Sequence, residues 1–315
     1  TSLEIDPSCI NPASPLENQA IAFAIDETES SVNDLSDDVT NMNNDGTIDY
    51  PGMGLDDPTP LEIPSINVVK SLTNIQNANS NIPGNKDVTY RFTIQNTGNT
   101  NLVGIDLIDQ IQNQLGPVWV GITSMPTFVL STASVTSILN PNFNGGSQAN
   151  MFNGTTGNIH PGQFVTVQLT IEIDPNKDNT YPLLTNQATT NGDAILNNGM
   201  QTTVTDASDD GINPKGINPN YLGDTGTSND PTPLIVPAIS TVKNVVSYQN
   251  ALSGIEGHYD VVMNISVKNI GNVHLTNISL LDTIELTKYV GPYFVGLAPT
   301  TNPNIVNSNL TQNPT

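Results

Sequence analysis

Two segments of the chain place oxygen-bearing side chains at alternate positions, a spacing at which several of them can reach one cation. More carboxylate and amide side chains follow in the first segment, and each segment ends with an aspartate before a proline. The candidate ligands are Asp34, Ser36, Asp38, Asn41, Asn43, Asp45, Asp49 and Asp57 in the first segment and Asp206, Ser208, Asp210 and Asp230 in the second. Because calcium prefers such oxygen ligands, we expect calcium at both segments.

This calcium pattern is incomplete, which leaves a second interpretation open. The bidentate glutamate that closes an EF-hand loop is missing, because the twelfth position counted from Asn41 is Gly52. The second segment also diverges from the first after Gly211. In the alternative, both segments are solvated polar hinges whose carboxylates repel one another.

A second candidate site combines a lysine, an aspartate and an asparagine. Lys70 continues a run of apolar residues at alternate positions, and so does Asp109 after a second such run. Asn186 lies between Leu184 and Ala188 in a third. Because alternate residues of a strand face one side, all three side chains are predicted to point into one core, where an unpaired ammonium group is costly.

This set resembles the residues that form spontaneous isopeptide bonds in fimbrial and adhesin sandwiches. The resemblance implies that the amine of Lys70 attacks the carboxamide of Asn186, while a protonated Asp109 polarises its carbonyl group. The bond would tie the first strand of a domain to its last. The alternative is that Lys70 reaches solvent at a sandwich edge while Asp109 and Asn186 cap turns.

A tandem repeat carries these residues. Residues 57–61 (Asp-Pro-Thr-Pro-Leu) recur at 230–234, and the Asn-x-Gly-Asn sequence of residues 96–99 recurs at 269–272, both at an offset of 173. Residues 4–7 match 172–175 at an offset of 168. We therefore expect the end of one unit, a complete second unit and the beginning of a third.

The acidic segments contain few apolar residues and are predicted to be linkers between these units. The expected organisation is 1–28 as the last strands of a preceding repeat, 29–63 as an acidic linker, 64–203 as a complete repeat, 204–236 as a second acidic linker and 237–315 as the first part of the next repeat.

The repeats are predicted to be all-β. Tyr90, Phe92 and Ile94 alternate with polar residues, and a longer alternation runs from Val165 to Ile173. No segment has a helical period, and 140–160 reads as a long loop. The expected architecture is a series of antiparallel β-sandwiches joined by acidic linkers, with a closed barrel as the alternative.

Composition narrows the function. The chain has 30 acidic and 8 basic residues and a formal net charge of −22, which repels nucleic acid and anionic lipid. No apolar run predicts membrane insertion, and Cys9 is the only cysteine. Because no arrangement of residues is typical of an active site, we expect a protein that is not an enzyme.

Three stretches carry a family resemblance: residues 87–102, 161–163 and 184–189. They resemble the bacterial cell-surface repeat catalogued as domain of unknown function eleven. The resemblance implies an immunoglobulin-like sandwich in secreted or cell-surface proteins. The Asn-rich composition and the Asp-Asp-Pro-Thr sequence are similar to giant adhesins of Bacteroidetes-type bacteria, including those of gliding motility.

The sequence thus predicts an extracellular stalk of a surface adhesin or fibre, stiffened by calcium, that projects a binding tip. Other parts of the protein would contact a surface or glycan, and neighbouring fibres would associate. The alternative is that the repeats themselves bind glycan or neighbouring fibres.

Overall fold

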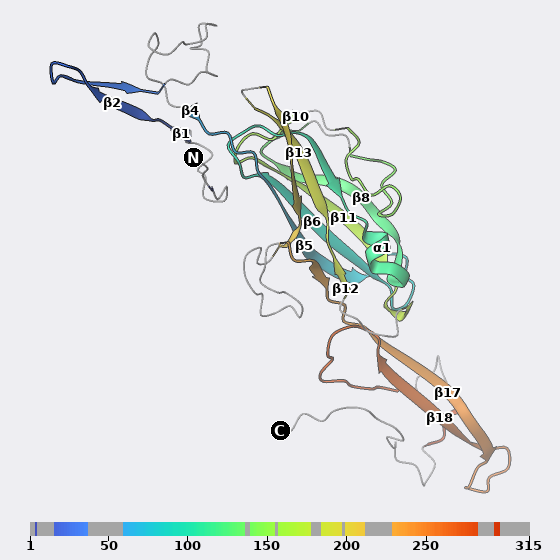
Figure 1. Ribbon diagram of the computed structural model, residues 1–315. Helices are drawn as coiled ribbons and strands as arrows, with labels where there is room; N and C mark the ends of the chain where they lie inside the picture. The colour runs from blue at the N-terminus through green and yellow to red at the C-terminus, as the bar shows by residue number, and fades with distance from the viewer. Residues whose placement is uncertain are drawn as a thin grey trace. The chain divides into compact units, whose positions relative to one another are not determined.

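The computed structural model describes residues 4, 16–36, 59–135, 139–154, 157–177, 184–196, 199–211, 229–282 and 293–296. The chain forms two compact units, Thr1–Val236 and Pro237–Thr315 (Figure 1). Strands dominate both units, which confirms the predicted all-β class. Within the described residues, no helix is long and apolar enough to cross a membrane.

A sandwich of two sheets occupies most of the first unit. Its larger sheet has the strand order β15, β5, β6, β11, β8. The neighbouring strands are antiparallel, except that β15 runs parallel to β5. The bounds are β5 (Ile66–Asn77), β6 (Lys86–Asn96), β8 (Trp119–Ser131), β11 (Phe164–Ile173) and β15 (Asp209–Asp210).

The smaller sheet has β13 (Thr189–Ile195) between β7 (Val103–Ile108) and β14 (Gln201–Ala207). Gly192 on β13 brings the two sheets close together. A Cβ atom at this position would lie 2.7 Å from Cδ1 of Ile105 and 3.4 Å from Cδ1 of Ile66 on the opposite sheet. Because neither sheet closes on itself in the described residues, the fold is a sandwich rather than a barrel.

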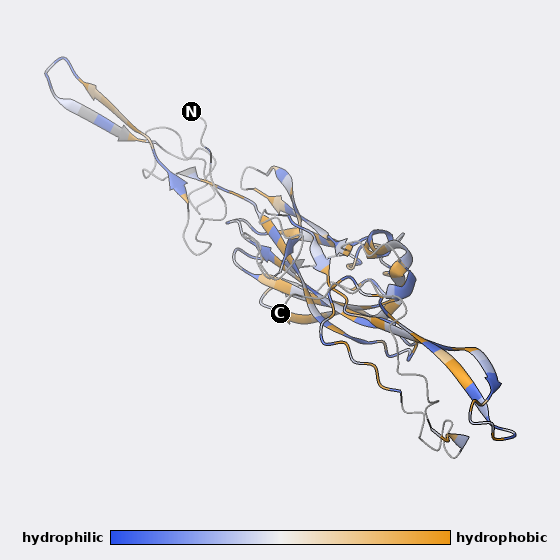
Figure 2. Cartoon of the chain, turned by 90° about the horizontal axis from the view of Figure 1, so that it is seen from below, coloured by the Kyte–Doolittle hydropathy of each residue, from blue (hydrophilic) through white to orange (hydrophobic). Residues whose placement is uncertain are grey.

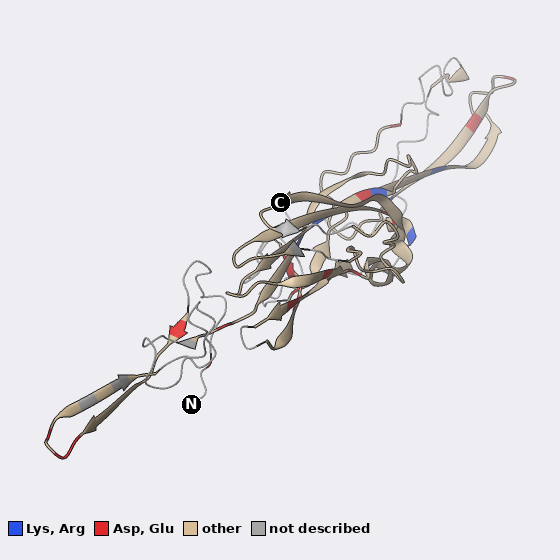
Figure 3. Ribbon diagram, turned by 90° about the horizontal axis from the view of Figure 1, so that it is seen from above, with Lys and Arg blue, Asp and Glu red and all other residues tan. Residues whose placement is uncertain are grey.

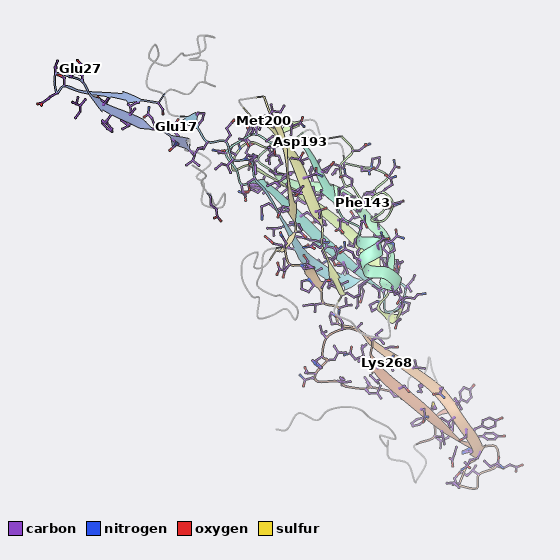
Figure 4. The ribbon with its side chains drawn as sticks, in the orientation of Figure 1. Glu17, Glu27, Phe143, Asp193, Met200 and Lys268 are labelled. Atoms are coloured by element: carbon purple, nitrogen blue, oxygen red, sulfur yellow. The ribbon has the colours of Figure 1, made fainter. Side chains whose placement is uncertain are left out.

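The core follows the predicted alternation. Tyr90, Phe92 and Ile94 of β6 are fully buried, and β11 buries every second residue from Val165 to Ile173 together with Thr166 and Glu172 on its other face. Apolar and polar residues alternate along most of both strands in the sequence, and Figure 2 colours the chain by this hydropathy. Side chains of both sheets fill the space between them (Figure 4).

Short elements close the ends of this sandwich. They are α1 (Ile111–Leu115), η2 (Gly116–Val118), β9 (Ser134–Val135), β10 (Gly157–Asn158), η3 (Pro175–Lys177), β12 (Leu184–Asn186) and β16 (Thr232–Leu234). The sequence pattern did not predict α1, because a helix of five residues is too short to display a period. It is held by tertiary packing, since Ile111 and Leu115 are buried.

The described ends of the predicted linker 204–236 belong to the sandwich, which corrects the predicted boundaries. β14 continues to Ala207, β15 pairs with β5, and β16 pairs with β12. The division between the units follows Val236. The Asp-Pro-Thr-Pro-Leu sequence at 230–234 is therefore the last strand of a sandwich, whereas the sequence pattern placed it at the entry to the next one.

Other parts of the chain repeat portions of this architecture. In the first unit, β1 (Glu17–Asn18) pairs with β4 (Thr59–Pro60) as β12 pairs with β16. A hairpin of β2 (Ile21–Ile25) and β3 (Ser31–Leu35) precedes β4. In the second unit, β17 (Ile239–Asn250) and β18 (Tyr259–Asn269) form a hairpin like that of β5 and β6.

The repeated Asn-x-Gly-Asn sequence forms the same turn in both copies. The side-chain nitrogen of Asn96 donates to the carbonyl oxygen of Thr100 at 2.7 Å, and Asn269 donates to Val273 at the same distance. The glycine two residues later donates its backbone N–H to the asparagine side chain at 3.0 Å in each copy. The turn is therefore specified locally.

Substitution of Gly98 tests the packing of this turn. A Cβ atom at Gly98 would lie 2.2 Å from the carbonyl oxygen of Ile63 and 2.5 Å from the backbone nitrogen of Ser65. Because backbone atoms cannot move away cheaply, we expect Gly98→Ala to lower the free energy of unfolding by about 2–3 kcal/mol. Gly121→Ala is the matched control, because a Cβ there meets nothing within 4 Å. Equal urea midpoints for the two variants would contradict the prediction.

Candidate functional site

Lys70 lies inside the sandwich and does not reach its edge. It follows Ile66 and Val68 on the inward face of β5, and its side chain has no exposed area. Its Nζ atom lies 2.7 Å from Oδ2 of Asp109, which is also fully buried. The alternative in which Lys70 extends into solvent therefore does not hold for this unit.

Asp109 bridges Lys70 and Asn186. It directly follows β7, where its backbone N–H donates to the carbonyl oxygen of Ala149 at 2.9 Å. The Nδ2 atom of Asn186, at the end of β12, donates to Oδ1 of Asp109 at 2.8 Å. The structure thus brings together the three residues that the sequence pattern directed to one core.

Aromatic rings surround the lysine. Its Nζ atom lies 4.5 Å from the ring centroid of Tyr90 and 5.0 Å from that of Phe92, both on β6. Burial lowers the pKa of Lys70 to about 8, although the charge of Asp109 and its hydrogen bond act in the opposite direction. Burial, and secondarily the charge of Asp109, raises the pKa of the Tyr90 hydroxyl. The cluster therefore disfavours separated charges.

Hydrogen bonding in this cluster is not saturated. Oδ1 of Asn186 and the hydroxyl oxygen of Tyr90 are buried and have no hydrogen-bond partner among the described residues. A buried polar atom without a partner costs about 1–3 kcal/mol, so a purely structural network is expected to satisfy it. The cluster holds an amine and a carboxamide against one shared carboxyl group, shielded from water.

The main chain of Lys70 is a second point of contact. Its carbonyl oxygen accepts hydrogen bonds from Oγ1 of Thr232 on β16 at 2.9 Å and from the backbone N–H of Gly211, next to β15, at 2.6 Å. Lys70 therefore joins the first strand of the sandwich to its last two strands through its backbone, and to Asp109 through its side chain.

The serine residues predicted as calcium ligands have structural partners in both copies. The hydroxyl oxygen of Ser208 accepts a hydrogen bond from the backbone N–H of Ala188 at 3.0 Å, and Ser36 does the same for Ala20 at 2.9 Å. Asp34 lies on β3. Asp38, Asn41, Asn43, Asp45, Asp49 and Asp57 lie outside the described residues.

The predicted calcium ligands of the second acidic segment lie beside the last strands of the sandwich, β14 to β16. Asp209, Asp210 and Asp230 are buried, and Oδ1 of Asp230 accepts the backbone N–H of Asp210 at 3.2 Å. Asp206 is half-buried, and its Oδ2 accepts the backbone N–H of Val68 at 2.7 Å. Burial raises the pKa of Asp206 to about 6, with a smaller contribution from the charge of Asp209. In the part of the chain that the structure describes, no group of three or more His, Cys, Asp or Glu residues is arranged to hold a metal ion.

The lysine and aspartate of the cluster meet again in the second unit. Nζ of Lys243 lies 2.9 Å and 2.7 Å from the two carboxylate oxygens of Asp282, at the same offset of 173 from Lys70 and Asp109. Asn18, which matches Asn186, lies opposite Thr59 in β1 and β4, as Asn186 lies opposite Thr232. Each partial copy therefore places its members of the set at the corresponding position.

Thr232 and Tyr90 belong to this site but were not among its predicted residues. Thr232 lies within the repeated Asp-Pro-Thr-Pro-Leu sequence, so its recurrence as Thr59 was an available signal. Tyr90 was recognised as a core residue, but its contact with Lys70 depends on the register between β5 and β6.

No protein-family model matches the chain, and no curated protein matches it significantly.

The raised pKa of Asp206 predicts a specific dependence of stability on pH. Its ordinary pKa is 3.8, so the folded chain binds more protons than the unfolded chain between about pH 4 and 6. The contribution of Asp206 to stability is therefore complete below pH 4 and is lost as the pH rises through 6. We expect Asp206→Asn, which keeps the acceptor oxygen for Val68, to gain stability relative to the natural chain between pH 4 and 7.

Urea unfolding of Asp206→Asn and of the natural chain at pH 4 and at pH 7, with a chelator present, measures this difference in stability. Asp26→Asn is the control, because hydrogen bonds from Thr28 and Ser30 lower the pKa of that exposed carboxyl group. A relative stability of Asp206→Asn that is the same at pH 4 and pH 7 would exclude the raised pKa.

Proposed function

We propose that this chain is a non-enzymatic, extracellular repeat region of a large bacterial surface adhesin or fibre, in which the sandwiches are spacers of a stalk that projects a binding tip. The observation that carries the proposal is the hydrogen bond that joins the first strand of the sandwich, β5, to its last strand, β16, at the carbonyl oxygen of Lys70.

Force applied to a stalk enters and leaves each unit through its terminal strands. In this unit, the hydrogen bonds that Thr232 and Gly211 donate to the carbonyl oxygen of Lys70 connect those strands directly. The ion pair with Asp109 connects β5 to the end of β7, and Asn186 extends the connection to β12. Tension between the ends of the unit therefore acts on several buried contacts together.

Repetition and composition support an extracellular stalk. The repeat keeps the turn at Asn96, the terminal strand pair and the lysine–aspartate pair in its other copies. Figure 3 shows how few basic residues accompany the acidic ones, and the net charge of −22 favours solubility and opposes nucleic acid binding. The resemblance to domain of unknown function eleven implies an immunoglobulin-like topology and a location at the cell surface. In this proposal, other parts of the protein bind the target surface or glycan.

The repeats themselves are the second candidate for adhesion, because β8 is exposed. It is an edge strand of the larger sheet, and Phe128, Val129 and Leu130 on it are each more than a third exposed. Exposed apolar residues on an edge strand favour association with neighbouring fibres or stacking on a sugar. Binding of the recombinant chain to a glycan array would favour this function over a spacer.

The mechanical proposal predicts that Thr232→Val weakens the unit. Valine keeps the shape of threonine but removes the hydrogen bond to Lys70, which contributes about 1 kcal/mol. In single-molecule pulling between the ends of the chain, we expect a lower unfolding force than for the natural chain. Thr203→Val is the control, because Thr203 bonds the exposed side of Asp193 within the smaller sheet. Similar forces for both variants would contradict a mechanical role of this contact.

We also propose that calcium binds the acidic segments and stiffens the connection between units. Support comes from the alternating ligands of the sequence and from Asp210 and Asp230, which lie together at the sandwich end. A cation would replace carboxylate repulsion by attraction. We expect X-ray scattering to give a larger maximum dimension with calcium than with chelator, and a smaller response for the double variant Asp210→Asn, Asp230→Asn. Identical profiles with and without calcium would rule this out.

A further inference from the structure

We propose that Lys70 and Asn186 become joined by an intramolecular isopeptide bond, which forms within the folded sandwich with Asp109 moving the protons. The bond would lie inside one unit, so its formation does not depend on the stalk function.

The geometry supplies the three groups that such a reaction needs. Lys70 carries the nucleophile, Asn186 the carboxamide and Asp109 a carboxyl group that contacts both, at 2.7 Å and 2.8 Å. All three side chains are fully buried. Because they come from β5, β12 and the end of β7, folding itself brings them together and excludes water that would compete with the amine.

The first step removes two buried charges. A proton passes from Nζ of Lys70 to Oδ2 of Asp109, which leaves a neutral amine and a neutral carboxylic acid. Burial of both side chains makes this charge separation costly and lowers the pKa of Lys70 to about 8, although the rings of Tyr90 and Phe92 beside Nζ attract an ammonium group. The neutral amine is the form that can attack a carbonyl carbon.

The second step exchanges one amide for another. The lone pair of Nζ attacks Cγ of Asn186, while the acid of Asp109 donates a hydrogen bond to the carboxamide. A C–N bond forms between Nζ and Cγ, and the bond between Cγ and Nδ2 breaks. A second proton moves from Nζ through Asp109 to Nδ2, which leaves as ammonia. Asp109 retains the first proton, so atoms and charge balance without an oxidant or cofactor.

Two further observations favour reaction over a static network. Oδ1 of Asn186 is buried without a partner among the described residues, so the carbonyl group that the amine would attack lacks the hydrogen bond expected of a structural asparagine. The ion pair recurs as Lys243 and Asp282, and the asparagine recurs as Asn18. The reactive set therefore belongs to the repeat, not to one unit alone.

Intact mass spectrometry of the folded chain of residues 1–315 tests the bond directly. The expected mass is lower than that of the sequence by one ammonia molecule. The loss is one rather than two, because no asparagine at the offset of 173 from Asn186 lies within these residues to serve Lys243. An unchanged mass in a folded chain would overturn the proposal without any variant being needed.

Trypsin digestion locates the crosslink. Modification of Lys70 blocks cleavage after it, so the expected product is a branched peptide that joins residues 1–86 to residues 178–215. Separate peptides that end at Lys70 would contradict the bond. Loss of water in place of ammonia, with Lys70 joined to Asp109, would overturn the assignment of Asn186 as the acceptor.

Variants distinguish this bond from other losses of ammonia. Asn-Gly sequences such as Asn144-Gly145 can cyclise with the same change in mass, but that reaction does not involve Lys70. We therefore expect the full sequence mass for Lys70→Met and for Asp109→Asn, and the reduced mass for the control Lys86→Met, which removes a partly exposed lysine from β6. Loss of ammonia that persists in Lys70→Met would overturn the proposal.

Pulling on single molecules gives a readout other than mass. The bond would shield the 115 residues between Lys70 and Asn186 from extension. Unfolding of the natural chain should therefore release a contour length shorter by roughly 400 Å than that of Asp109→Asn. Equal lengths would show that β5 and β12 are not covalently joined.

Discussion

The buried ion pair of Lys70 and Asp109 constrains the rest of the sandwich. An ammonium group and a carboxylate in an apolar core cost several kcal/mol of desolvation, which their attraction offsets only at close distance and with further hydrogen bonds. The pair therefore requires β5, the end of β7 and β12 to meet in one arrangement, with Asn186 completing the contacts of Asp109. A shift of β5 by two residues would keep Lys70 facing the core without its partner, and a shift by one residue would turn it away from Asp109. The pair therefore favours one register as well as joining the strands.

Repetition extends this constraint from one unit to an array. The turn at Asn96 and its copy at Asn269 use the same side-chain contacts. In each unit, local hydrogen bonds therefore determine the turn that follows the second strand of the hairpin. The strand that ends a unit, represented by β16 and β4, pairs with the segment that carries the asparagine. The pairing of the last strand of a unit consequently also positions the asparagine of that unit.

Most of the acidic residues have no basic residue available to pair with them. With 8 basic residues for 30 acidic ones, most carboxylates need other donors, and several accept hydrogen bonds from the main chain. Asp206 accepts from Val68, Asp209 from Asn229 and Asp26 from Thr28. Asp206 thereby connects the described beginning of the predicted second linker to β5 of the sandwich.

The sequence alone determined the all-β class, the repeat offset, the inward direction of Lys70, Asp109 and Asn186 and the core residues of β6 and β11, because strand periodicity is a local property of the chain. It could not place β15 and β16, because their few residues carry no period and are held by contacts with β5 and β12 that lie far away in sequence. Nor could it show that Asp109 touches Lys70 and Asn186 at once, or that no described residue bonds Oδ1 of Asn186. Those facts depend on strand order and on packing between the sheets, which only the tertiary structure decides.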